Sequence, residues 1–261
     1  MKGFLKMLIG LYLIVGFAIY IMQDRLILSP DKIPENLDYG LGDEVEINVD
    51  EDISINNIWI KNGTSSKGVF LYFHGNKGNI IRALYQLRAI QNPDYDYFIT
   101  DYRGYGKSDG TTKSDETLLN DADAVYQFLK SKYAEDKIYV LGYSLGTGMA
   151  SYVASLNNPK YLFLVAPFTS LTSIKNKYLW FYPDFLLKFK LPVKKYLESV
   201  KCNVSIIHGT QDNIIDYQNS ENLKELFPSK VNLISSQGQS HRGIIFDPLV
   251  TQEVRRVLNK Y

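Results

Sequence analysis

The chain has 261 residues, of which 45% are hydrophobic and 13% aromatic, so it can bury a sizeable core and is not a disordered protein. Its formal net charge of +1 argues against nucleic acid or another polyanion as a partner. Cys202 is the only cysteine, which excludes an intramolecular disulfide and a cysteine-based zinc site.

The N-terminal residues 4–22, FLKMLIGLYLIVGFAIYIM, contain Lys6 as their only charge. At about 1.5 Å per residue, a helix of this length spans roughly 28 Å, close to the hydrocarbon thickness of a bilayer. A signal peptide would need small residues at a cleavage site, whereas Tyr20, Ile21 and Met22 are bulky. A buried helix of a soluble domain is the remaining alternative. We predict an uncleaved membrane anchor over residues 1–25, followed by one domain over residues 26–261.

The charges beside this anchor predict its orientation. Lys2, Lys6 and the terminal amine precede or begin the apolar run, while Arg25 follows it next to Asp24. Because cytoplasmic flanks carry the excess of basic residues, a cytoplasmic N-terminus is favoured by a small margin. The rest of the chain is then expected on the non-cytoplasmic side.

After a linker rich in proline, glycine and acids at residues 29–44, the pattern becomes that of a sheet. Residues 44–48 and 53–60 alternate apolar and polar side chains and predict an antiparallel hairpin. Short, almost wholly apolar runs follow, which are typical of parallel strands buried on both faces. They lie at residues 68–73, 95–100, 138–142, 161–166, 204–209 and 231–235.

Helical patterns separate these runs, at residues 80–91, 114–133, 147–156, 219–227 and 248–259. Alternating strands and helices predict an α/β fold with a mostly parallel, doubly wound sheet. Residues 167–201 interrupt the alternation, because they are too long for one helix and contain Pro183 and Pro192. We predict that they form a small helical cap over the carboxyl edge of the sheet, where ligands bind in such folds.

Gly142-Tyr143-Ser144-Leu145-Gly146 is a G-x-S-x-G motif placed between a predicted strand and a predicted helix. A nucleophile on such a tight turn needs small residues two positions before and after it. The amino terminus of the following helix also favours a developing anion. A structural serine in a glycine-rich corner is the alternative, but the strand–turn–helix context favours Ser144 as a nucleophile.

Ser144 needs a base, and the sequence offers only three histidines. His74 and His208 each end an apolar strand, a usual place for a packed, hydrogen-bonded histidine. His241 lies in a polar loop after the last predicted strand and follows Ser144 in the chain order serine, acid, histidine. His241 is therefore the predicted base.

Asp212 lies in the loop after residues 204–209 and stands 29 residues before His241. A carboxylate there would fix the histidine tautomer and stabilise the imidazolium. Asp216 is the nearest rival, and helix capping is the structural alternative for both. For the oxyanion we predict two backbone N–H donors, from Leu145 and from Asn76 in the loop HGNKGN, with Lys77 as an alternative to Asn76.

Two nucleotide-binding motifs are excluded, because each lacks one glycine that it requires. A phosphate-binding loop ending at Gly106-Lys107-Ser108 would need glycine at residue 101, which is Asp101. A dinucleotide fingerprint would need glycine where Ser144 stands. No histidine–carboxylate cluster has zinc-ligand spacing, so neither a metal nor a cofactor is predicted.

Taken together, YFHGNKGN, TDYRGYGKSDG, VLGYSLGTGMA, APFTSL, IIHGTQDNIID and the late histidine resemble the α/β-hydrolase superfamily. More narrowly they resemble its membrane-anchored alpha/beta-hydrolase-domain proteins. The resemblance implies an α/β-hydrolase fold, a triad of Ser144, Asp212 and His241, and an oxyanion hole at Asn76 and Leu145. It also implies a structural loop beside the active site in TDYRGYGKSDG.

The histidine loop departs from the family pattern. Gly238-Gln239-Ser240-His241-Arg242 has serine where the nearer glycine is usual. The triad is not affected, but the loop conformation and any role of Arg242 cannot be carried over from the family.

Residues 171–201 hold seven lysines and two acids, mixed with the aromatic residues Tyr178, Trp180, Phe181, Tyr182, Phe185 and Phe189. An amphipathic cap with aromatics on the sheet and lysines in water explains this composition. The alternative hypothesis is that the cap rests on anionic lipid headgroups of the bilayer that holds the anchor.

The function predicted is a membrane-anchored serine hydrolase that cleaves carboxylic esters or thioesters of acyl or lipid-like substrates through an acyl-enzyme. The alternatives are a serine peptidase or amidase on the same triad, and a catalytically silent binding protein on a hydrolase scaffold.

Overall fold

The computed structural model describes residues 1–63 and 65–260; Thr64 and Tyr261, the end of the predicted 26–261 domain, lie outside the described residues. Among the described residues, one sheet has the strand order β10-β9-β8-β7-β4-β6-β3-β2. Its strands are β2 (Asp43–Asp50), β3 (Ile53–Ile60), β4 (Val69–Phe73), β6 (Asp96–Thr100), β7 (Ile138–Tyr143), β8 (Tyr161–Val165), β9 (Val204–Gly209) and β10 (Val231–Ser236). In the order β6-β4-β7-β8-β9-β10, each strand pairs in parallel with the next. Strands β2 and β3 form the predicted antiparallel hairpin.

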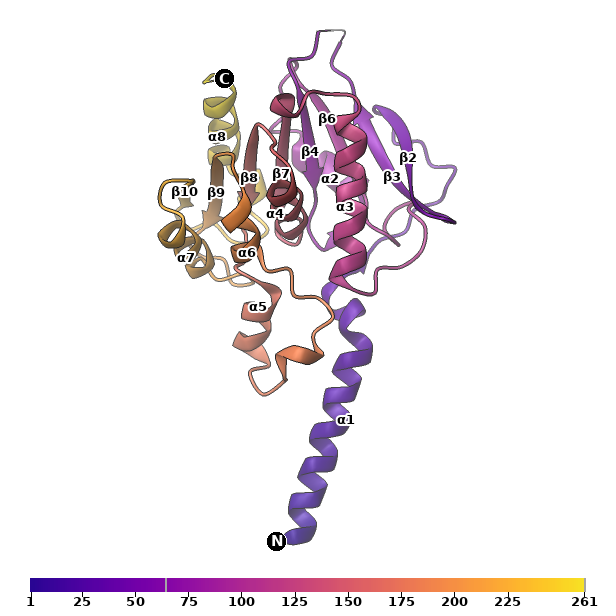
Figure 1. Ribbon diagram of the computed structural model, residues 1–261, viewed down its shortest axis with the longest axis vertical. Coiled ribbons are helices and arrows are strands. Elements are labelled where there is room, and N and C mark those ends of the chain that lie inside the picture. The colour runs from indigo at the N-terminus through magenta and orange to yellow at the C-terminus, as the bar shows by residue number, and fades with distance from the viewer. Residues whose placement is uncertain (64, 261) are drawn as a thin grey trace.

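Helices cover both faces of this sheet (Figure 1). They are α2 (Ile80–Leu87), α3 (Asp115–Lys130), α4 (Gly146–Leu156), α6 (Val193–Ser199), α7 (Gln218–Leu226) and α8 (Pro248–Leu258). Successive side chains of a strand point to opposite faces, so Leu71 of β4 packs with α3, α4 and α6 while Tyr72 packs with α2 and α8. Both faces are therefore buried, which explains the apolar runs and confirms the predicted doubly wound arrangement.

The first helix, α1 (Lys2–Ile27), projects from the sheet domain as a long rod (Figure 1). It is long and apolar enough to cross a bilayer, and no residue of its apolar window is buried. The polar residues Gln23, Asp24 and Arg25 lie near its C-terminal end, where it meets the domain. The described residues thus contain one candidate membrane span, at the N-terminus.

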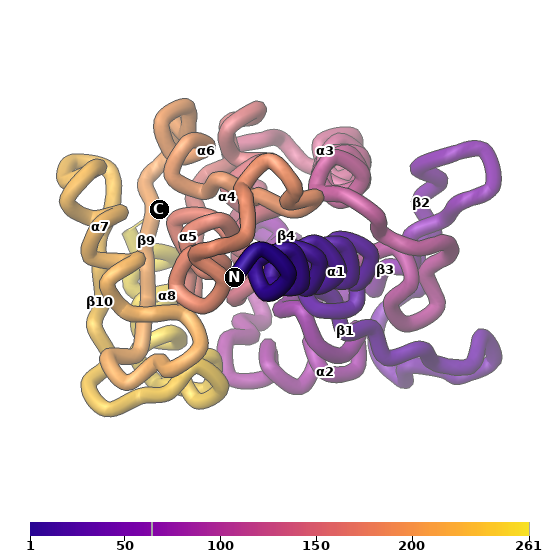
Figure 2. Tube along the Cα trace, turned by 90° about the horizontal axis from the view of Figure 1, so that it is seen from below, coloured from indigo at the N-terminus to yellow at the C-terminus, as the bar shows by residue number. Residues whose placement is uncertain are grey.

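The segment between β8 and β9 contains α5 (Leu171–Tyr178), a 3₁₀ turn at Asp184–Leu186, and α6. Val193 and Leu197 of α6 are buried in the same cluster as α4, so α6 belongs to the helical layer. The cap predicted over residues 167–201 therefore includes one ordinary crossover helix. The remaining part, residues 167–191, lies beside α1, as the views along and across α1 both show (Figures 1 and 2).

A second, two-stranded parallel sheet was not predicted. It pairs β1 (Ser29–Pro30) with β5 (Lys77–Gly78), and Ser29 N donates to Asn76 O at 2.9 Å. The residues just after α1 are thus joined directly to the loop that follows β4. This loop contains the predicted oxyanion donor.

Candidate active site

Ser144 occupies a strained turn between β7 and α4, with φ at 51°, in the left-handed region that non-glycine residues rarely adopt. The two glycines of the motif make the turn sterically feasible. A Cβ on Gly142 would lie 2.6 Å from Gly146 O, and one on Gly146 would lie 2.0 Å from Phe73 O. The backbone of β4 and α4 therefore fills the space that any larger residue would need.

Ser144, His241 and Asp212 form one continuous chain of hydrogen bonds, although 97 residues separate the first two. Ser144 Oγ lies 2.9 Å from His241 Nε2, and His241 Nδ1 lies 2.6 Å from Asp212 Oδ2. These side chains follow β7, β9 and β10 and meet at the carboxyl end of the sheet. The carboxylate fixes the proton of His241 on Nδ1, so that Nε2 is free to accept the Ser144 proton.

The carboxylate of Asp212 is held by more groups than the sequence predicted. Its Oδ1 accepts the N–H groups of Ile214 and Ile215 at 2.9 and 2.8 Å. Its Oδ2 accepts both His241 Nδ1 and, at 3.0 Å, His208 Nε2. His208 Nε2 also faces the Ile215 carbonyl at 3.1 Å, so this nitrogen must carry its proton. His208 thus helps to position Asp212, a role that its interpretation as a packed, hydrogen-bonded histidine did not include.

Burial by itself would raise the pKa of Asp212, but hydrogen bonds from His208 and His241 outweigh it and hold the pKa well below its ordinary value. The carboxylate therefore stays ionised and provides the negative charge that stabilises a His241 imidazolium. Asp216, the rival acid, lies instead on the surface, where it pairs with Lys177 at 3.2 Å. The structure brings Asp212 to His241, and Asp216 is engaged elsewhere.

The two predicted oxyanion donors, Leu145 and Asn76, both line the same pocket as Ser144. Leu145 directly precedes α4, so its N–H lies at the amino terminus of that helix. Among the described residues, neither the Leu145 N–H nor the Asn76 N–H donates a hydrogen bond to a backbone carbonyl of the surrounding turns. The Asn76 side chain points back to the end of α1, where Nδ2 donates to Ile27 O at 3.2 Å. The predicted donors thus lie at the pocket beside the serine.

The loop over residues 101–110 braces the Asn76 loop from behind. Tyr105 donates its hydroxyl proton to Asn76 O at 2.7 Å, and Tyr102 donates to His74 O at 2.5 Å. His74 itself is buried and lies 3.1 Å from Asp101. This placement agrees with the structural role predicted for the loop and with the interpretation of His74 as a packed histidine.

The histidine loop is well defined despite its serine. Tyr143 stacks against the His241 ring and donates its hydroxyl proton to His241 O at 2.9 Å. The carbonyl of Ser240 accepts the N–H groups of Gly243 and Ile244, which closes a turn directly after His241. Arg242 is exposed and lines the pocket.

The pocket around Ser144 has a volume of about 420 Å³. One part of its lining is apolar and comes from the end of α1, from the cap and from the loop after β9: Leu26, Ile27, Phe168, Leu171, Ile174, Ile214 and Ile215. Pockets of this size and lining bind small organic ligands. The end of α1 is therefore a wall of the candidate active site.

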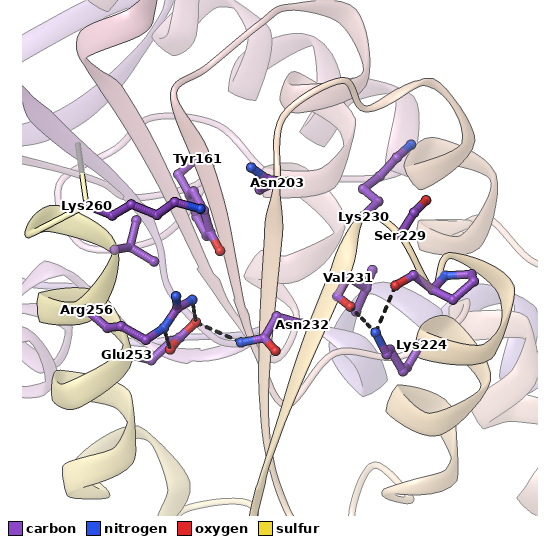
Figure 3. Close-up of a pocket in the computed structure, with 12 residues that line it drawn as sticks. Tyr161, Asn203, Lys224, Ser229, Lys230, Val231, Asn232, Glu253, Arg256 and Lys260 are labelled. Atoms are coloured by element: carbon purple, nitrogen blue, oxygen red, sulfur yellow. Dashed lines mark hydrogen bonds and ion pairs between the residues drawn. The ribbon is translucent and has the colours of Figure 1, made fainter.

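A larger cavity of about 610 Å³ lies at the opposite end of the sheet, where β8, β9 and β10 begin (Figure 3). Glu253 in this cavity accepts both Arg256 and Asn232, and Lys224 donates to the carbonyls of Pro228 and Val231. Neither histidine nor an activated serine lines it. Several of its polar groups thus bind groups within the same cavity, and the smaller pocket, which holds Ser144 and His241, is the candidate site.

Comparison with known proteins agrees with this geometry. The family described as "alpha/beta hydrolase fold" matches residues 68–204. The lysophosphatidylserine lipase ABHD12 of Danio rerio is 28% identical over 219 residues, which cover 72% of this chain and 57% of that protein. The ABHD12 of Bos taurus is 24% identical over an alignment that covers 100% of this chain and 80% of that protein. The chain thus spans little more than half the length of the zebrafish relative.

Solved structures share the fold. The esterase Pf2001 of Pyrococcus furiosus superposes with a TM-score of 0.69 at 21% identity, covering 90% of this chain and 98% of that one. Est1E of Butyrivibrio proteoclasticus, with ferulic acid bound, gives a TM-score of 0.63 at 21% identity, covering 83% of this chain and 98% of that one. With a match over more than half of its residues, the chain belongs to the alpha/beta hydrolase fold family, in its alpha/beta-hydrolase-domain branch.

Proposed function

We propose that this protein is a membrane-anchored serine hydrolase that cleaves carboxylic ester or thioester bonds of single-chain lipids. The observation that carries this proposal is the hydrogen-bonded chain from Ser144 through His241 to Asp212, at the bottom of a pocket with an apolar wall. The esterase and lipase names of the proteins that share the fold agree with this reaction class.

In the first half-reaction His241 Nε2 takes the proton of Ser144 as the serine oxygen attacks the acyl carbonyl. The Leu145 and Asn76 N–H groups donate hydrogen bonds to the oxyanion that forms, and the amino terminus of α4 adds a favourable dipole. The ionised Asp212 stabilises the His241 imidazolium. His241 then gives its proton to the departing alcohol or thiol, which leaves the acyl group on Ser144.

In the second half-reaction the same groups act on water. His241 removes a proton from a water molecule that attacks the acyl carbonyl, and the oxyanion again lies at Leu145 and Asn76. Collapse of this intermediate releases the fatty acid and returns the proton to Ser144. No step requires a cofactor.

The proposed domain organisation is a membrane anchor over residues 1–25 and a hydrolase domain over residues 26–261, with the cap inserted after β8. Several contacts join the anchor to the cap. The Gln23 side chain is 2% exposed, donates to Leu186 O and accepts Lys188 N, each at 2.8 Å. Farther down the helix, Tyr12 donates its hydroxyl proton to Phe181 O at 3.0 Å. The cap therefore lies along the part of α1 that enters the bilayer.

The tip of this cap exposes aromatic side chains, with Trp180 and Phe185 each 78% exposed. Two lysines of the segment are less available to lipid head groups, because Lys175 pairs with Asp184 and Lys177 pairs with Asp216. We therefore propose that the cap enters the bilayer through its aromatic tip, as Trp and other aromatic residues do at membrane interfaces. The charge asymmetry around α1 supports a placement of the hydrolase domain on the non-cytoplasmic side.

Tryptophan fluorescence tests this membrane contact, because the chain has only Trp59 and Trp180. The full chain carrying Trp59→Phe, reconstituted in nanodiscs with acyl-brominated phospholipid, should show strong quenching of Trp180. The matched variant Trp180→Phe reports on Trp59, which packs against Phe98 and Tyr133 and should stay unquenched. Equal quenching of the two, or quenching of neither, would refute an embedded cap.

Two alternatives remain testable against the proposed reaction. A peptidase would use the same triad on amides, and a silent binding protein would not use it at all. Covalent labelling of the full chain by a fluorophosphonate probe, lost in Ser144→Ala, separates the silent scaffold from an enzyme. Turnover of an ester series, from acetyl esters to lysophospholipids, compared with peptide amides then separates an esterase from a peptidase. A wild-type chain that is not labelled would refute the proposal.

A further inference from the structure

The pocket around Ser144 has a cationic part besides its apolar part. Lys77, Arg82 and Arg242 line it, and its lining contains no carboxylate among the described residues. In the part of the chain that the structure describes, none of the three cations forms an ion pair or a hydrogen bond with another side chain. Arg103 and Arg256, by contrast, are each neutralised by a carboxylate. The pocket therefore gathers three positive charges that have no ion-pair partner among the described residues.

Two of these charges act close to the nucleophile. Tyr143 precedes Ser144 and stacks on His241, with ring centroids 5.6 Å apart. Burial raises the pKa of Tyr143 to about 12; the positive charge of Arg82 opposes that rise, the negative charge of Asp212 adds to it, and the positive charge of Arg242 opposes it. Both guanidinium groups are thus near enough to the residue beside the nucleophile to act on it electrostatically. An anion bound between them would lie beside Ser144.

The cationic and apolar parts come from different elements. Lys77 and Arg82 belong to the loop and helix after β4, and Arg242 follows the catalytic histidine candidate, whereas the apolar wall comes mainly from α1 and the cap. Seen along α1, helices α2 and α5 lie on different sides of it (Figure 2). A ligand that fits both parts must be apolar at one end and anionic at the other.

We propose that Lys77, Arg82 and Arg242 bind the anionic head group, phosphate or carboxylate, of a single-chain lipid ester whose acyl chain lies against the α1 and cap residues. Arginine suits this role, because its planar guanidinium can donate two hydrogen bonds to one phosphate or carboxylate. The scissile carbonyl then lies between the two parts, above Ser144. This inference rests on the proposed hydrolase function.

The test compares two lysophospholipids of the same acyl chain in mixed micelles with the full-length protein. Lysophosphatidylserine carries a net negative head group and lysophosphatidylcholine a neutral one. In the wild type, kcat/KM should favour the anionic substrate. Arg82→Gln and Arg242→Gln should each lower this preference about tenfold, because a charge-assisted hydrogen bond is lost. Arg82→Lys, which keeps the charge, should retain more of the preference than Arg82→Gln, and added salt should weaken it in the wild type.

Arg88→Gln is the matched control, because Arg88 directly follows the same helix, is exposed and does not line the pocket. It should keep the wild-type preference. No preference in the wild type, or an equal loss in Arg88→Gln, would overturn the head-group site. Inhibition of neutral-ester hydrolysis by inorganic phosphate in the wild type but not in the double variant Arg82→Gln/Arg242→Gln, without any preference for the anionic lysophospholipid, would assign the cations to free phosphate and would also overturn it. A wild type that cleaves neutral esters without any head-group preference would refute only this inference, whereas one that cleaves no ester refutes the proposed function.

Discussion

The two ends of the sheet hold cavities of opposite character. At the amino end lies the larger cavity, of about 610 Å³, where Glu253, Arg256 and Asn232 bind one another (Figure 3). At the carboxyl end, a pocket of about 420 Å³ holds a strained serine and unpaired cations. The difference teaches that satisfied polar groups indicate structure, while strained or unpaired groups kept beside a cavity indicate a ligand or a reaction.

The largest effect on activity is expected when the nucleophile at the carboxyl end of the sheet is removed. Ser144→Ala should lower ester turnover by about 10⁶-fold, because the other triad members act only through this oxygen. Ser151→Ala is the matched control, since Ser151 is buried in α4 and its hydroxyl has no partner among the described residues. Steady-state hydrolysis of a chromogenic ester measures both variants. Residual wild-type activity in Ser144→Ala would show that the strained turn is not the reactive centre.

A smaller but still large effect is expected at the acid. Asp212→Asn should lower kcat by about 10⁴-fold, because an amide neither fixes the His241 tautomer nor stabilises its cation. Asp216→Asn, four residues later and exposed, should retain near wild-type kcat. The same ester assay applies, with circular dichroism to confirm folding. If the two variants lost equal activity, the assignment of the acid would be wrong.

The hydrogen bond from His208 to Asp212 should matter less. His208→Gln is expected to lower kcat about tenfold with little change in KM, which corresponds to one hydrogen bond of about 1.4 kcal/mol. With one donor fewer, Asp212 becomes a better acceptor for His241, so the acid limb of the kcat profile should move to higher pH. A merely structural role for His208 would leave that limb in place.

The smallest effect on activity is expected at the amino end. Glu253→Gln should leave ester turnover unchanged but cost about 1–3 kcal/mol of unfolding free energy, because Arg256 and Asn232 lose a buried partner. Burial would raise the pKa of Glu253, but hydrogen bonds, first from Arg256, lower it below its ordinary value. Its stabilisation is therefore complete above the unfolded pKa of about 4.3 and is lost as pH falls below it. Thermal unfolding at neutral and acid pH, compared between wild type and variant, should show the difference disappear in acid.

The parallel strands and their helices were predictable because burial on both faces leaves continuous apolar runs such as residues 69–73 and 138–143. The positions of Ser144, Asp212 and His241 were predictable because each follows a strand, and carboxyl ends of parallel strands meet at one edge. Their roles remain a proposal, while their meeting in space is an observation.

Other features left no pattern in the sequence. The pairing of β1 with β5 involves two residues on each side, too few for any periodicity. The contact of Gln23 with the cap joins its side chain to a backbone carbonyl 163 residues away, and a lone glutamine near the end of an apolar helix does not identify a partner. The second hydrogen bond on Asp212 could have been suspected from His208 standing four residues before it, but its direction depends on how the loop after β9 turns back.

The end of α1 is hydrogen-bonded directly to the Asn76 loop, so α1 is joined closely to the candidate active site. Ile27 O accepts from Asn76, and Ser29 N donates to Asn76 O. On the proposed membrane placement, an enzyme tethered so tightly would meet its substrate only within the lipid surface. It encounters substrate according to the substrate's mole fraction in the lipid surface rather than its bulk concentration. Diluting a substrate with inert lipid should therefore slow it, even when the amount of substrate per volume is unchanged.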